Sequence, residues 1–134
     1  MNKLKGMIVE IHSSDNISMI KVNVDGDIFS SIVLEGKKSP VNYKIKDSVA
    51  VLFKETEVGI AKNLTGMISL RNRFKSKIVK IDKGPILAKI TLNYKKNKIE
   101  SVISTQSCEQ MELKEKDEIE WLVKTNEVSL MKNP

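Results

Sequence analysis

The sequence contains one cysteine and one histidine, and their scarcity excludes several kinds of site. Cys108 cannot form an internal disulfide, because the sequence has no second cysteine. Cys108 and His12, the one histidine, are too few to form a zinc site of the usual cysteine and histidine ligands. No Ser-His-Asp set can assemble around a lone histidine that is flanked by Ile11 and Ser13. We therefore expect no metal held by side chains, no cofactor and no enzymatic activity.

Aromatic residues are also few, at 4% of 134 residues, and there is no long apolar run. Single-strand nucleic-acid binders stack bases on aromatic side chains, so this composition argues against a nucleic-acid partner despite a net charge of +6. The lack of an apolar run, at the N-terminus as elsewhere, argues against a membrane span or signal peptide. We expect a cytoplasmic protein with no membrane partner.

What is present is a series of short, β-branched segments in which apolar and polar residues alternate. A period of two, broken by turns such as Asp25-Gly26, predicts strands. The predicted strands span 7–11, 19–24, 28–34, 48–53 and 58–60, and then 77–81, 88–92, 99–104, 119–123 and 128–130.

The second half of the sequence repeats the first at an offset of seventy positions. Asn2-Lys3-Leu4-Lys5 corresponds to Asn72-Arg73-Phe74-Lys75, and Glu57-Val58 corresponds to Glu127-Val128. A fixed internal period indicates duplicated structural units. The sequence therefore predicts two domains, 1–64 and 67–134.

One short helix is predicted between the third and fourth strands of the second repeat. Ser104 or Thr105 is a suitable N-cap, and Cys108 and Met111 would then face inward. Three strands, a short helix and two further strands are typical of an OB-type barrel. We expect an all-β fold of two tandem OB-like small β-barrels, each with one short helix, that pack together or with other subunits.

Two stretches of the second repeat carry a set of hydrogen-bond donors. If the first and last strands of the barrel lie near one another, these stretches meet at one rim. Guanidinium, ammonium, hydroxyl and amide groups suit a tetrahedral dianion, which accepts hydrogen bonds and needs no metal ligand or base. The predicted ligand-binding residues are Ser69, Arg71, Asn72, Lys124 and Thr125.

These residues also carry a resemblance to a known family. The matching motifs are Ser69-x-Arg71-Asn72, Val102-Ile103-Ser104-Thr105-x-Ser107, Leu113 and Lys124-Thr125-x-x-Val128. They resemble the Mop, or molbindin, module, a TOBE type of OB-fold, and cover essentially all of the second repeat. The resemblance implies binding of molybdate or tungstate, by the five residues named above, at subunit interfaces of a homo-oligomer, a dimer or trimer.

The first repeat departs from this pattern. Lys3 and Lys54 supply cations, but Glu55 occupies the position of Thr125. A carboxylate repels an incoming dianion. We expect the first repeat to be structural, with a weaker contribution from Lys3 and Lys54.

Three functions remain open from the sequence. The first is intracellular binding, buffering or storage of molybdate or tungstate, which the donor set favours. The second is an oxyanion-sensing module acting with a separate transcription regulator or transporter ATPase. The third, suggested only by the positive charge, is a nucleic-acid-binding OB protein.

Overall fold

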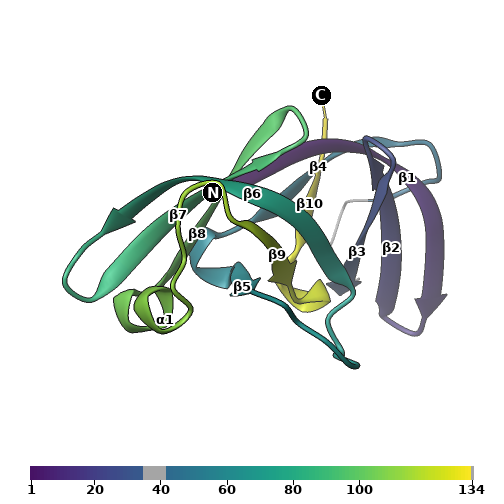
Figure 1. Cartoon of the computed structure of the whole chain (residues 1–134). Coiled ribbons are helices and arrows are strands. Elements are labelled where there is room, and N and C mark those ends of the chain that lie inside the picture. Colours follow the sequence, from purple (N-terminus) through teal and green to yellow (C-terminus); the bar gives the residue numbers. More distant parts are fainter. Residues whose placement is uncertain (35–41, 134) are drawn as a thin grey trace.

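The structure is a computed structural model that describes residues 1–34 and 42–133 (Figure 1). The described part of the first half contains β1 (Asn2–Ser14), β2 (Ile17–Val24), β3 (Asp27–Leu34), β4 (Ser48–Phe53), the 3-10 turn η1 (Glu55–Glu57) and β5 (Gly59–Ala61). The second half contains β6 (Asn72–Lys83), β7 (Leu87–Tyr94), β8 (Asn97–Ser104), α1 (Thr105–Gln110), β9 (Glu118–Val123), η2 (Thr125–Glu127) and β10 (Ser129–Lys132). The predicted all-β fold is confirmed.

Each of the two sheets is completed by a strand from the other half of the chain. The hydrogen-bonded order is β10-β4-β1-β2-β3 in one sheet and β5-β9-β6-β7-β8 in the other. Figure 1 shows the two halves side by side, with β5 and β10 in the region between them. Each predicted repeat, 1–64 and 67–134, thus contributes its last strand to the sheet of the other.

The two halves also have β-bulges at equivalent positions. The register of β1 with β2 shifts around Val9, and that of β6 with β7 shifts around Val79. A β-bulge bends a strand, and each long first strand pairs with β4 or β9 along its first half, up to Met7 or Lys77, and with β2 or β7 from that residue onward, across the bulge. The duplication seen in the sequence is therefore a duplication of backbone geometry.

The few aromatic side chains are concentrated in the core between the two halves. Rings from opposite halves stack in two places, with centroids 4.2 Å apart for Phe29 and Phe74 and 5.6 Å apart for Phe53 and Trp121. Such pairs stabilise a core beyond the area that they bury. Trp121 is fully buried and its Nε1 donates to Ser76 Oγ at 2.9 Å, which confirms that it is a core residue.

A second connection between the halves runs through two asparagine side chains. Asn72 accepts a hydrogen bond from the Ser30 N–H at 2.7 Å and donates to the Ser30 carbonyl at 2.9 Å. Asn2 makes the equivalent pair of 2.9 Å bonds with Glu100. Because β3 and β8 are sheet edges, each asparagine satisfies backbone groups that would otherwise lack a strand neighbour.

The predicted helix of the second half is confirmed as α1. Ser104 is its N-cap, and the Ser104 hydroxyl accepts a bond from the Ser107 N–H at 3.0 Å. Cys108 faces the core and is buried. The helix expected in the first half would fall at the equivalent positions 35–40, which lie outside the described residues. Within 1–34 and 42–133 no helix is long and apolar enough to cross a membrane.

The strand exchange predicts that the two halves unfold together. Val51, in the first half, is fully buried and pairs with both Leu4 and Leu130. We expect Val51→Ala to lower the free energy of unfolding by about 2 kcal/mol, because it removes buried methyl groups and leaves a cavity. Fluorescence of Trp121, in the second half, and far-UV circular dichroism would shift to the same lower denaturant midpoint. Separate transitions, with Trp121 unaffected, would contradict this picture.

Candidate functional site

The two donor-bearing stretches meet at one end of the β6–β9 pairing. Asn72 lies opposite Val123 in this antiparallel ladder. Arg71 directly precedes Asn72 and Lys124 directly follows Val123, so both backbones emerge at the same corner of the sheet. The first strand of the second half pairs here with the fourth strand, whereas the last strand, β10, has crossed to the other sheet.

On one side of this corner lie Ser69 and Arg71, in the segment that leads into β6. Both are exposed, and an Nη2 hydrogen of Arg71 donates to the carbonyl of Ile68. Among the described residues Arg71 has no carboxylate within ion-pair distance. The remaining donors of its guanidinium are therefore directed to solvent, where an anion has access to them.

On the other side lie Lys124 and Thr125, where β9 passes into η2. Lys124 is the N-cap of η2 and is exposed, and Thr125 is half-buried. The ammonium of Lys124 forms no ion pair with a carboxylate in the part of the chain that is described. A guanidinium and an ammonium, neither of them ion-paired to a carboxylate among the described residues, thus flank one corner, an arrangement that attracts anions.

Asn72 occupies a different environment from its predicted partners. It is fully buried, and its side-chain oxygen and nitrogen both bond to the backbone of Ser30. The amide nitrogen retains one further hydrogen, and the observed bonds give the side chain a structural role. Contact with a ligand stays a prediction for Asn72, as for the other four residues.

Two residues that the sequence analysis did not select adjoin this corner. The backbone of Ser30 bonds to the side chain of Asn72. The buried Ser31 donates its Oγ hydrogen to the carbonyl of Val128 at 2.6 Å. Ser31 has a counterpart seventy positions later, because Ser101 donates to the carbonyl of Val58 at 2.7 Å. The recurrence of serine at positions 31 and 101 could have drawn attention to these residues. The sequence does not reveal, however, which backbone group each hydroxyl contacts.

A pair of acidic side chains joins η1 and η2. Burial, followed by a hydrogen bond to Glu57, raises the pKa of Glu127 above its usual value, while Lys124 acts in the opposite direction. Glu57 also accepts a hydrogen bond from the Lys54 N–H at 3.0 Å. The hydrogen bond between the Glu127 and Glu57 carboxyl groups therefore links the two halves beside the donor-rich corner.

The equivalent corner of the first half is arranged differently. Glu55 forms an ion pair with the amino group of Met1, and that bond is the largest cause that lowers the pKa of Glu55. Lys54 is exposed, and Lys3 lines a separate hollow of about 500 Å³. Because the Glu55 carboxylate lies at this corner and pairs with the Met1 amino group, the corner is less suited to an anion than its counterpart.

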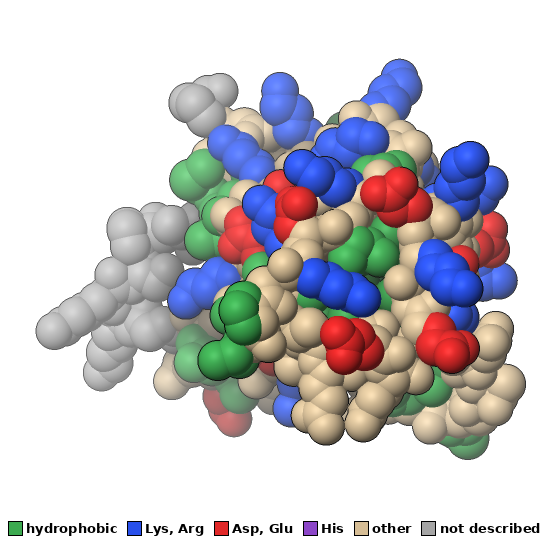
Figure 2. Space-filling model, turned by 60° about the vertical axis from the view of Figure 1, so that its left-hand side comes forward, with side chains coloured by type: hydrophobic (Ala, Val, Ile, Leu, Met, Phe, Trp, Pro, Cys, Tyr) green, Lys and Arg blue, Asp and Glu red, His purple; other side chains and the backbone are tan. Residues whose placement is uncertain are grey.

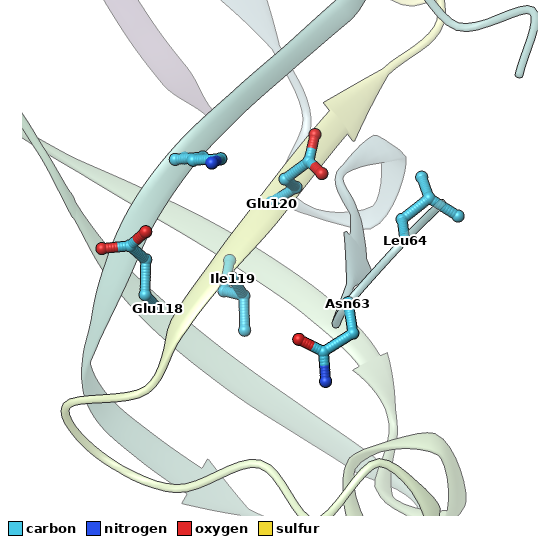
Figure 3. Close-up of a pocket in the computed structure, with 6 residues that line it drawn as sticks. Asn63, Leu64, Glu118, Ile119 and Glu120 are labelled. Atoms are coloured by element: carbon cyan, nitrogen blue, oxygen red, sulfur yellow. The ribbon is translucent and has the colours of Figure 1, made fainter. Parts of the chain in front are cut away.

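Another hollow, of about 200 Å³, lies against the outer face of β6 and β9 (Figure 3). Figure 3 shows the carboxylates of Glu118 and Glu120 on one strand, with Asn63 and Leu64 from the neighbouring segment. Lys75 is the one cation in its lining. Two carboxylates against one ammonium make this hollow unsuitable for a dianion.

The surface charges of the described residues are mixed. On the face drawn in Figure 2, Lys and Arg side chains are interspersed with Asp and Glu. Arg73 and Glu120, for example, form two hydrogen bonds of 3.0 and 3.2 Å. No cluster of three or more His, Cys, Asp and Glu side chains suited to a metal ion occurs within 1–34 and 42–133.

Comparison with known proteins gives the family. No family model matches the sequence. Molybdenum-pterin-binding proteins 1 and 2 of Clostridium pasteurianum are each 38% identical to this chain over 65 residues, which are 48% of this chain and 96% of each relative. Molybdenum-pterin-binding protein 3 of the same organism is 34% identical over 65 residues. This chain is therefore about twice as long as each relative, as a duplication requires.

The fold has a counterpart among solved structures. The cytoplasmic molybdate-binding protein ModG, crystallised with molybdate bound, superposes with a TM-score of 0.92 over 98% of this chain and 96% of that one, at 18% identity. The shared fold defines the class of protein, a pair of fused OB-like β-barrels. The 38% identity across nearly the whole of its relatives places the chain in the Mop family. The resemblance found in the sequence is thereby confirmed.

The position of Glu127 predicts a pH effect on stability. Its pKa is raised in the folded protein, so its contribution to stability is present below the ordinary value of 4.5 and is lost as pH rises through the folded pKa. Glu127→Gln keeps a hydrogen-bond donor and removes the charge. We expect the variant to melt above the wild type at neutral pH and close to it below pH 4.5. Glu118→Gln, at an exposed carboxylate of β9, is the control, and identical pH profiles for all three proteins would refute the assignment.

Proposed function

We propose that this protein binds molybdate or tungstate as intact dianions at the corner between the start of β6 and the end of β9. Arg71 and Lys124 would supply positive charge, and Ser69, Thr125 and Asn72 would supply neutral donors. The observation that carries the proposal is the β6–β9 register, which brings the two unpaired cations to one corner. The family membership supports this ligand class, since the matching relatives are named for molybdenum.

The chemistry of the donors supports a fully deprotonated anion. Molybdate and tungstate at neutral pH accept hydrogen bonds and donate none, whereas hydrogen phosphate carries a proton that needs an acceptor. A corner built from ammonium, guanidinium, hydroxyl and amide groups therefore disfavours phosphate. Sulfate has the same charge as molybdate, so its rejection would depend on the size of the site.

The protein would act as a cytoplasmic buffer or store for these oxyanions and would catalyse no reaction. Its two repeats, 1–64 and 67–134, would differ in role, because Glu55 stands where the second repeat has Thr125. We further propose a homo-oligomer, dimer or trimer, with sites at subunit interfaces. Exposed large apolar side chains, such as Ile86 and Leu87 at 77% and 57% exposure, support further subunit contacts.

The burial of the aromatic residues gives no support to nucleic-acid binding. Phe29, Phe53, Phe74, Tyr94 and Trp121 lie in the core, and the sixth aromatic residue, Tyr43, is half-buried with its hydroxyl bonded to the carbonyl of Leu130. Bases that stack on protein need exposed rings. On the face drawn in Figure 2, the mixed charges also differ from the continuous basic track that a phosphate backbone favours.

Isothermal titration with molybdate, tungstate and sulfate tests the proposal. We expect saturable binding of both heavy oxyanions and at least tenfold weaker binding of sulfate. Absence of heat with molybdate and tungstate, for protein that circular dichroism shows to be folded, would refute the proposed function.

A matched pair of variants tests the position of the site. Lys124→Gln removes a charge-assisted hydrogen bond, which is worth roughly 1.5 to 3 kcal/mol, so we expect the Kd for molybdate to rise by about 10- to 150-fold. Lys54→Gln is the control, because Lys54 is the equivalent residue of the first half and is also exposed. Equal effects of the two substitutions, including no effect of either, would contradict a site centred on the second half.

A further inference from the structure

Ser31 lies in the first half of the chain but bonds to the second. Its side chain is fully buried on β3, and its Oγ donates to the carbonyl of Val128 at 2.6 Å. A buried hydroxyl has no access to a ligand in solvent. Any influence of Ser31 on binding must therefore act through Val128.

Val128 in turn fixes the turn that carries two of the proposed ligand-binding residues. It is the C-cap of η2, and its N–H donates to the carbonyl of Thr125 at 3.4 Å. Lys124 is the N-cap of the same turn. Because η2 is only three residues long, displacement of its C-terminal end moves its N-terminal end as well.

The neighbouring residue of β3 holds the other side of the corner. The backbone of Ser30 binds both polar atoms of the Asn72 side chain, and Asn72 is bonded in sequence to Arg71. Ser30 and Ser31 thus fasten the start of β6 and the end of η2 to one strand. That strand therefore contacts both donor-bearing stretches, whose backbones are also joined by the β6–β9 ladder.

We infer that β3 of the first half is a positioning element for the oxyanion site of the second half, and that Ser31 is a positioning residue. This inference rests on the proposed function. It assigns the first repeat a definite role: the repeat holds the ligand-binding residues of the second in place through buried hydrogen bonds. Ligand residues are effective only when a surrounding shell of contacts fixes their geometry.

The internal symmetry of the chain provides a matched control. Ser101 is also fully buried and donates to the carbonyl of Val58 at 2.7 Å, next to η1. Ser31→Ala and Ser101→Ala therefore remove the same bond from equivalent places. Ser31 supports η2, the turn that carries Lys124 and Thr125, whereas Ser101 supports η1, which reaches that turn only through the contact between Glu57 and Glu127.

The experiment compares the melting temperature and the molybdate Kd of wild type, Ser31→Ala and Ser101→Ala. Both variants are expected to melt lower by similar amounts, as the loss of a structural hydrogen bond requires. The Kd is expected to rise about fivefold or more in Ser31→Ala, with faster dissociation, and to stay within about twofold of wild type in Ser101→Ala.

Equal Kd values in the two variants, with wild type binding normally, would overturn the positioning role and leave the proposed function intact. Absence of binding in wild type would overturn the proposed function itself. If Ser31→Ala does not fold, Ser31→Cys and Ser101→Cys serve instead, because a thiol has a similar size and is a weaker donor. The same difference between the two positions is expected for that pair.

Discussion

The structure depends on an exchange of contacts between two similar halves. Strand β10 completes the sheet of the first half and β5 completes that of the second, while Asn2 and Asn72 bond to the edge strands β8 and β3. A repeat of about seventy residues would by itself lack its last strand and expose an edge of unpaired backbone groups. The exchange supplies the missing strand and pairs the exposed edge. An aromatic cluster that includes Phe29 and Trp121 fills the space between the sheets.

The candidate site is a consequence of this exchange. Since β10 leaves for the other sheet directly after η2, the end of β9 and the start of β6 are left at an accessible corner with Arg71 and Lys124. The same departure brings η2 against β3, where Ser31 holds Val128. On the proposed function, the first half would supply support and the second half would supply the donors. A duplicated chain can divide these roles because both halves keep the contacts of the core although Glu55 stands in the first half where the second has Thr125.

Much of this arrangement could be predicted from the sequence. Alternation of apolar residues marked the strands, an offset of seventy marked the duplication, and Ser104 marked the start of α1. The exchange of β5 and β10 could not be predicted, because a short alternating segment has the same pattern whichever sheet it joins. The side-chain partners of Asn72, Ser31 and Glu127 were also hidden, since each lies in the other half, and a pattern along one strand carries no information about a contact across an interface.

The central claim is that Arg71 and Lys124 present one corner of hydrogen-bond donors to a tetrahedral dianion. X-ray diffraction from crystals grown with tungstate, collected near a tungsten absorption edge, locates the metal directly. We predict an anomalous peak within hydrogen-bonding reach of both side chains, from one subunit or from adjoining copies, with the oxygens of the anion accepting hydrogen bonds from them. A well-occupied peak elsewhere, with this corner holding only water, would contradict it.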